Sequence, residues 1–200
     1  MSQAIDFYFD FYSPYGYLAH YKIDAIAERY GRSVNWHAIL LGPAFQAVGS
    51  KPLIEIPLLG AYSVNDFART ARLEGVPYMP PATFPAATLA AGRTFYWLHD
   101  QNPDLAKAFA KAAYKAAFAE GRDLLQLATL KDIAEGLGID ALALEAAIQM
   151  DAVKTRFKKA VQASLDKGVF GSPFVIVDGE QFWGNDRLPQ VELWLARGGW

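Results

Sequence analysis

The residues with the clearest chemical potential are Ser13, Pro14, Tyr15 and Gly16, which follow an aromatic run at residues 4–11. The run predicts a β-strand and the residues after Ser13 predict a helix, so Ser13 stands at a strand-to-helix junction. In C-x-x-C oxidoreductases this junction carries a cysteine thiolate whose pKa is lowered by the helix N-terminus. Here a hydroxyl takes the first position, and the chain contains no cysteine. The site can stabilise a sulfur anion only if a ligand brings the sulfur, so dithiol–disulfide exchange is excluded.

A serine hydroxyl is suited to holding such an anion. A free thiol with a pKa of about 8.5 is only about 3% ionised at pH 7. A hydrogen bond to a charged acceptor contributes roughly 1.5–3 kcal/mol, and the helix N-terminus adds roughly 0.3–1 kcal/mol. Together they would lower a thiol pKa by about one to two units. The alternative is that Ser13 only caps the helix, with Pro14 in its favoured place in the first turn.

The elements that must position Ser13 follow a recognisable order. A strand at residues 4–11, a helix at 14–30 and a strand at 33–39 predict a parallel β-α-β unit. A block of about 110 residues then reads as loops and helices, and the chain closes as α-β-β-α. The expected closing elements are a helix at 153–167, strands at 174–177 and 181–183, and a helix at 187–196. This order predicts an α/β, thioredoxin-like fold with a large all-helical insertion. Residues 1–40 and 168–200 would form the discontinuous thioredoxin-like domain, and residues 41–167 the insertion.

Two further segments could act with Ser13. Ser172 and Pro173 stand directly before the third expected strand, where thioredoxin-like folds place a cis proline that exposes the backbone of the preceding residue to a ligand. Asn185 and Asp186 precede the last helix, where they could receive an ammonium group. Capping of that helix is the simpler interpretation for this second pair.

Three motifs carry a resemblance to a known family. Residues 9–19 (Phe-Asp-Phe-Tyr-Ser-Pro-Tyr-Gly-Tyr-Leu-Ala), residues 49–52 (Gly-Ser-Lys-Pro) and residues 183–188 (Trp-Gly-Asn-Asp-Arg-Leu) resemble the glutathione-binding segments of a DsbA-like family. Its members are the bacterial 2-hydroxychromene-2-carboxylate isomerases and their relatives, the kappa-class glutathione transferases. The resemblance spans nearly the whole chain, and the third motif matches the isomerase branch.

The resemblance implies that glutathione is the cofactor and assigns roles to several residues. Ser13 would be the catalytic residue that hydrogen-bonds the glutathione sulfur, and Ser172, before a cis Pro173, would pair with the cysteinyl unit through its backbone. Asn185 and Asp186 would hold the γ-glutamyl end. Ser50 and Leu59 depart from the family pattern where the glycine carboxylate is held, and Lys51 is the candidate that would replace the missing contact.

The implied reaction is the interconversion of 2-hydroxychromene-2-carboxylate and trans-o-hydroxybenzylidenepyruvate in aromatic, naphthalene-type catabolism. A thiolate that adds to the conjugated double bond permits rotation about the resulting single bond and then leaves, so glutathione is regenerated. An aromatic carboxylate needs an apolar slot, for which Phe11, Tyr12 and Tyr96 are the first candidates. The other candidates are Phe84, Phe95 and Trp97 for the slot, with Lys51, Arg93 or His37 for the polar anchors.

Two alternatives stay open. A kappa-class-like transferase would consume glutathione by conjugating it to electrophiles, and a non-catalytic glutathione-binding module would bind without turnover. The resemblance also implies a homodimer.

Composition narrows the remaining function classes. The chain has 200 residues, is 52% hydrophobic and carries a formal net charge of −2, so no nucleic-acid-binding surface is expected. No apolar run reaches the length of a membrane span, and the first residues lack a signal-peptide pattern, so a cytoplasmic protein without membrane contact is expected. With no cysteine and three histidines, no metal site is expected.

Overall fold

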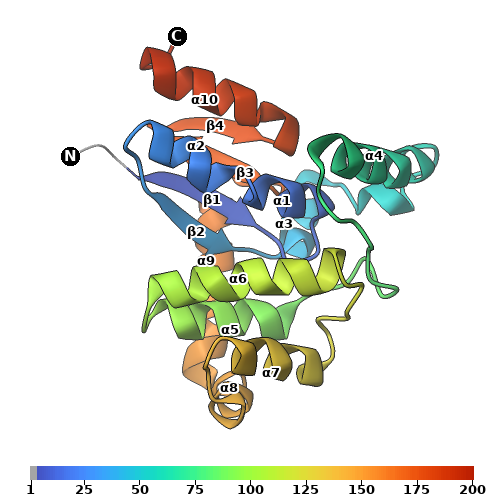
Figure 1. The fold of residues 1–200 in the computed structure, drawn as a ribbon, viewed down its shortest axis with the longest axis vertical. Coiled ribbons are helices and arrows are strands. Elements are labelled where there is room, and N and C mark those ends of the chain that lie inside the picture. The colour runs from blue at the N-terminus through green and yellow to red at the C-terminus, as the bar shows by residue number, and fades with distance from the viewer. Residues whose placement is uncertain (1–3) are drawn as a thin grey trace.

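A computed structural model describes residues 4–200. Its centre is a four-stranded mixed sheet in the order β2-β1-β3-β4 (Figure 1). Strand β1 (Ile5–Phe9) pairs in parallel with β2 (Val34–Ala38), as the sequence predicts. Strand β1 also pairs antiparallel with β3 (Phe174–Val177), which forms a hairpin with β4 (Glu180–Trp183). The carboxyl end of β1, which leads to Ser13, therefore lies beside the amino end of β3, which follows Pro173.

The single helix expected at residues 14–30 is wrong, because the structure has two. Helix α1 is Pro14–His20 and helix α2 is Ile23–Arg29. The His20 ring donates a hydrogen bond to the carbonyl oxygen of Tyr17, which the next helical turn would otherwise use, and the Lys22 amide bonds the Ala19 carbonyl in a tighter turn. Helix α1, which begins directly after Ser13, therefore has only seven residues.

Between β2 and β3, the regular elements of the described chain are all helical, which confirms the predicted fold class. They are α3 (Leu41–Val48), the 3-10 turn η1 (Leu53–Glu55), α4 (Leu59–Glu74), α5 (Leu89–His99), α6 (Pro103–Phe118), α7 (Leu127–Gly136), α8 (Ala141–Ala147) and α9 (Asp151–Asp166). The chain closes with the 3-10 turn η2 (Asn185–Arg187) and helix α10 (Leu188–Arg197), which packs on α2 and β4 (Figure 1).

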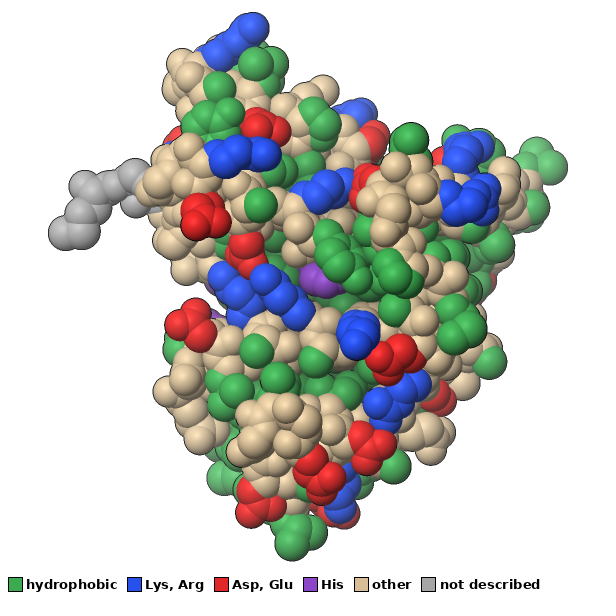
Figure 2. Space-filling model, viewed as in Figure 1, with side chains coloured by type: hydrophobic (Ala, Val, Ile, Leu, Met, Phe, Trp, Pro, Cys, Tyr) green, Lys and Arg blue, Asp and Glu red, His purple; other side chains and the backbone are tan. Residues whose placement is uncertain are grey.

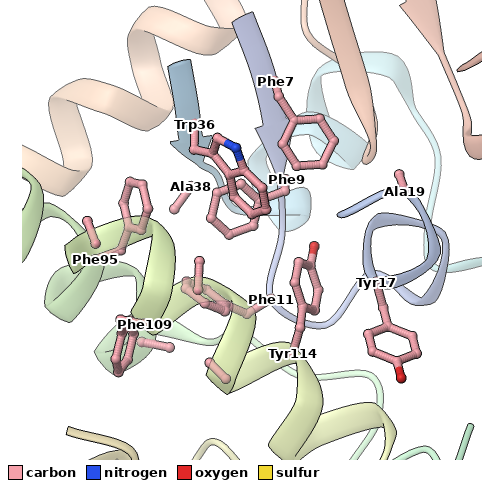
Figure 3. Close-up of a cluster of buried hydrophobic side chains, with 14 of the residues drawn as sticks. Phe7, Phe9, Phe11, Tyr17, Ala19, Trp36, Ala38, Phe95, Phe109 and Tyr114 are labelled. Carbon is pink, nitrogen blue, oxygen red and sulfur yellow. The ribbon is translucent and has the colours of Figure 1, made fainter. Parts of the chain in front are cut away.

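The helical insertion and the sheet share one core. Phe7 and Phe9 of β1 and Phe11 just beyond it are fully buried (Figure 3). The Phe9 ring contacts Phe95 of α5, and the rings of Phe9 and Phe11 both contact Tyr114 of α6. The same hydrophobic cluster continues into α7 and α9 and, on the other side, into α10. The sequence-based boundaries of the two domains stay a prediction, since the hydrophobic contacts run through both.

The seam between α5 and α9 gives a stability prediction. A Cβ added at Gly92 would overlap the ring of Phe157, which is buried against it. We therefore expect Gly92→Ala to lower the free energy of unfolding by about 1–3 kcal/mol, as overpacking does, measured by urea unfolding. Gly136→Ala in α7 is the matched control, because its Cβ would meet no atom within 4 Å. Equal stability of the two variants would contradict the expected overlap.

Candidate active site

Ser13 is the N-cap of α1, as the sequence indicates. Its Oγ accepts a hydrogen bond from the Gly16 amide at 3.0 Å and donates one to the carbonyl oxygen of Ser172 at 2.8 Å. The side chain is only 3% exposed. The one proton of the Ser13 hydroxyl is therefore directed at a backbone carbonyl that lies 159 residues away in the sequence.

The two motifs expected to act together do meet. The peptide bond between Ser172 and Pro173 is cis, as predicted. Besides the contact through its carbonyl, Ser172 accepts a hydrogen bond on its Oγ from the Asp10 amide at 2.9 Å. The turn that carries Ser13 and the loop that carries Pro173 are thus joined by two hydrogen bonds, and in both of them the turn donates and Ser172 accepts.

Asp10 is a site residue that the sequence reasoning missed. It is buried, and its two carboxylate oxygens accept hydrogen bonds from the amides of Tyr12 and Leu41, each at 2.8 Å. Burial raises the pKa of the Asp10 carboxyl to about 6, against the opposing effect of those two donors. The backbone carbonyl oxygen of Asp10 accepts a hydrogen bond from the Ser13 amide at 2.9 Å. A signal was present, because Asp10 is the one acidic residue in the apolar and aromatic stretch 7–19.

Asn185 and Asp186 lie in different environments. Asn185 is buried, and its Nδ2 donates to Glu74 of α4 at 2.9 Å, while Lys22 pairs with the same Glu74 oxygen at 2.5 Å. Asp186 is exposed and pairs with Arg187 at 2.8 Å. Gly184 is required here, since its φ is 112° and a Cβ would overlap the Asp186 carboxylate. The Asp186 carboxylate is thus exposed to solvent, whereas the Asn185 side-chain amide is fixed by its hydrogen bond to Glu74 of α4.

Two buried oxygens in this network lack a hydrogen-bond partner among the described residues, namely Asn185 Oδ1 and Glu74 Oε2. Buried acceptors are rarely left unpaired, because each costs roughly 1–3 kcal/mol. Both are acceptors, so the partner they call for is a hydrogen-bond donor.

Lys51 and Leu59 make none of the hydrogen bonds or ion pairs of this network among the described residues. Lys51 is exposed between α3 and η1, and it takes part in none of the ion pairs of the described chain. Leu59 is exposed in the first turn of α4. The assignment of Lys51 to the glycine carboxylate of glutathione stays a prediction.

The three aromatic residues first expected to line a substrate slot are core residues here. Phe11 is fully buried, and Tyr96 is buried with its hydroxyl donating to the Ala38 carbonyl at 3.1 Å. Tyr12 donates to Asp123 at 2.8 Å and accepts from the Leu124 amide at 3.1 Å. Burial raises the pKa of the Tyr12 phenol to about 12. Their role toward a substrate stays a prediction, and Tyr12, adjacent to Ser13, is the nearest to the site in sequence.

Two of the three polar anchors considered from the sequence, His37 and Arg93, have partners of their own. His37 contacts the Asp6 carboxylate at 2.8 Å on β1, and Arg93 donates to the Ile148 carbonyl at 3.4 Å. Over the face seen in Figure 2, basic and acidic side chains are both present from top to bottom. Within residues 4–200, no helix combines the length and apolar character that crossing a membrane requires.

Comparisons with known proteins identify the family and the fold of the chain. Residues 4–196 match the family described as DSBA-like thioredoxin domain. A 2-hydroxychromene-2-carboxylate isomerase of Sphingobium xenophagum is 34% identical over 197 residues, covering 98% of this chain and 99% of the relative. Glutathione S-transferase kappa 1 of Caenorhabditis elegans is 23% identical, covering 92% and 87%. The solved structure of a 2-hydroxychromene-2-carboxylate isomerase superimposes with a TM-score of 0.87 at 29% identity, covering 97% of this chain and 95% of that one.

Proposed function

The chain belongs to the DSBA-like thioredoxin family and to the family of 2-hydroxychromene-2-carboxylate isomerases, and from this premise we propose that it is a glutathione-dependent isomerase. Its reaction would interconvert 2-hydroxychromene-2-carboxylate and trans-o-hydroxybenzylidenepyruvate. The observation that carries the proposal is the hydrogen bond of 2.8 Å from the Ser13 hydroxyl to the Ser172 carbonyl oxygen, next to the cis peptide bond before Pro173. The chain has no cysteine, so the reacting sulfur has to come from a ligand.

The hydrogen bond between Ser13 and Ser172 supports a simple exchange on ligand binding. A ligand in extended conformation would offer its own cysteinyl N–H to the Ser172 carbonyl, which replaces Ser13 as donor. The Ser13 proton is then free to turn toward the ligand sulfur, while Ser13 Oγ still accepts from the Gly16 amide. Because a hydrogen bond to a charged acceptor is worth roughly 1.5–3 kcal/mol, this contact would favour the thiolate over the thiol.

The η2 end of the site fits the other terminus of glutathione. Its γ-glutamyl unit carries an ammonium group, which donates hydrogen bonds and bears a positive charge. Asn185 Oδ1 and Glu74 Oε2 are unpartnered acceptors among the described residues, and the exposed Asp186 carboxylate adds negative charge beside them. These residues would hold the ammonium group, with Lys22 fixing Glu74 at 2.5 Å.

When bound, glutathione supplies a thiolate nucleophile that adds reversibly to the conjugated double bond of the substrate. The chain's own part is to orient the sulfur through Ser13, to align the backbone of the ligand through Ser172, and to exclude water with the aromatic residues around Tyr12. No general base is required, because the hydrogen bond from Ser13 itself shifts the ionisation of the thiol.

A spectrophotometric assay tests the proposal. We expect conversion of 2-hydroxychromene-2-carboxylate only when glutathione is present, with the concentration of free thiol unchanged at the end. S-methylglutathione, which has no ionisable thiol, should compete with glutathione without supporting turnover. Thiol loss with a simple aryl halide electrophile and no isomerisation would identify a kappa-class-like transferase. Binding of glutathione without either reaction would leave a binding module.

The assembly and location expected from the sequence also belong to this proposal. A homodimer is supported by apolar side chains exposed on η1 and the start of α4, among them Leu58 at 92% exposure and the partly exposed Leu53, Leu59 and Tyr62. Light scattering on the purified protein measures its mass directly. A cytoplasmic location stays a prediction.

A further inference from the structure

The volume beside Gly16 is filled by a side chain from a distant helix. A Cβ built on Gly16 would overlap the phenol oxygen of Tyr114, and it would lie 3.0 Å from Ser172 Oγ and 3.1 Å from Ser13 Cβ. Gly16 is the third residue of α1 and does not need a positive φ, so its backbone conformation does not require glycine. The close approach of the Tyr114 hydroxyl is what excludes a side chain at position 16.

Tyr114 comes from α6 in the helical insertion and is fully buried. Its hydroxyl donates to the carbonyl oxygen of Asp10 at 2.9 Å, and Figure 3 shows its oxygen pointing from α6 toward the sheet. Burial raises the pKa of the Tyr114 phenol well above its usual value, so it acts as a neutral donor. The Asp10 carbonyl accepts a second hydrogen bond from the Ser13 amide at 2.9 Å. One carbonyl thus links the insertion to the residue that carries the chemistry.

From this geometry we propose that Tyr114 is a positioning residue for Ser13 and that Tyr114 and Gly16 form a matched pair. The Tyr114 hydroxyl, which belongs to the insertion, fixes the turn between β1 and α1 through its hydrogen bond to the Asp10 carbonyl. It occupies the volume that a side chain at position 16 would need. The proposal rests on the proposed function for its catalytic consequence, but the pairing itself does not depend on glutathione.

A double-mutant cycle followed by thermal unfolding tests the pairing without any ligand. Gly16→Ala in the wild-type background should lower the melting temperature by roughly 3–8 °C, because the new methyl group meets the pinned hydroxyl. In the Tyr114→Phe background that loss should largely vanish, since the hydroxyl is gone and alanine is the better helix former. Additive effects of the two changes would overturn the pairing.

The positioning role needs a readout at Ser13 itself. The Gly16 amide donates to Ser13 Oγ, so its hydrogen exchange rate reports whether that cap is formed. We expect Tyr114→Phe to speed exchange at Gly16 by about tenfold or more. Tyr17→Phe is the matched control, because Tyr17 is also fully buried and donates to a backbone carbonyl, that of Pro77, at 2.6 Å. An unchanged Gly16 rate in Tyr114→Phe, or an equal rise in both variants, would overturn the positioning role.

The same variants separate this proposal from the proposed function. If the isomerase activity is present, Tyr114→Phe should lower kcat with little change in the KM for glutathione, because the sulfur contact is weakened while the rest of the ligand is held as before. If the wild type shows no turnover at all, the proposed function fails, whereas the melting cycle and the exchange rates still decide whether Tyr114 positions Ser13.

Discussion

Ser13→Ala should reduce isomerase activity by about 10- to 100-fold, while the protein stays folded. The variant removes the one hydroxyl that can turn from the Ser172 carbonyl to a ligand sulfur, and a charge-assisted hydrogen bond is worth roughly 1.5–3 kcal/mol. The pKa of the bound thiol should rise by about one to two units in parallel. Steady-state kinetics gives the first quantity, and the ultraviolet absorbance of the bound thiolate against pH gives the second.

The controls for this variant separate capping from catalysis. Ser13 also caps α1 through the Gly16 amide, and loss of a cap costs about 1 kcal/mol of stability. Ser13→Gly keeps most of the capping preference but not the hydroxyl, so it should lose activity like Ser13→Ala with a smaller loss of stability. Activity in Ser13→Gly close to that of the wild type would contradict the sulfur contact and leave Ser13 as a cap only.

The free energy of unfolding should fall as the pH rises from about 4 to about 6, because the buried Asp10 carboxyl loses its proton in this range. Burial raises the pKa of Asp10 from its ordinary value of 3.8 to about 6 in the folded chain, so the fold binds a proton more tightly than the unfolded chain does. The stability due to this proton is fully present below pH 3.8 and is lost as the pH passes 6. A difference of about two pKa units corresponds to about 3 kcal/mol.

Comparison of the wild type with Asp10→Asn isolates this contribution. The asparagine cannot titrate. Between pH 4 and pH 7, the free energy of unfolding of the wild type, measured in urea, should therefore fall by about 3 kcal/mol relative to that of the variant. This change does not depend on any constant difference in stability between the two proteins. Asp178→Asn is the opposite control, because Arg32 lowers the pKa of Asp178 and that stabilisation is lost as the pH falls. Parallel curves for the wild type and Asp10→Asn would contradict the raised pKa.

Much of the fold could be read from local patterns. The aromatic run of β1, the turn at Asp178 and Gly179 between β3 and β4, and the breaks before Pro103 and at Gly75 all mark elements that the structure contains. The split between α1 and α2 could not be read, and where it occurs the His20 side chain bonds the Tyr17 carbonyl of α1. Periodicity records which face of a helix is apolar, but not which carbonyl a neighbouring side chain takes.

The sequence by itself determined that this protein cannot carry out dithiol–disulfide exchange with cysteines of its own, and it determined the helix start at which Ser13 lies. Without cysteine it has no nucleophilic sulfur of its own, and Ser13 before Pro14 fixes a capped helix start. Only the tertiary structure decided where the Ser13 proton points and that the insertion reaches the site through Tyr114. These contacts join segments about 100 to 160 residues apart, and they form because packing brings single atoms within hydrogen-bond distance, which no local pattern encodes.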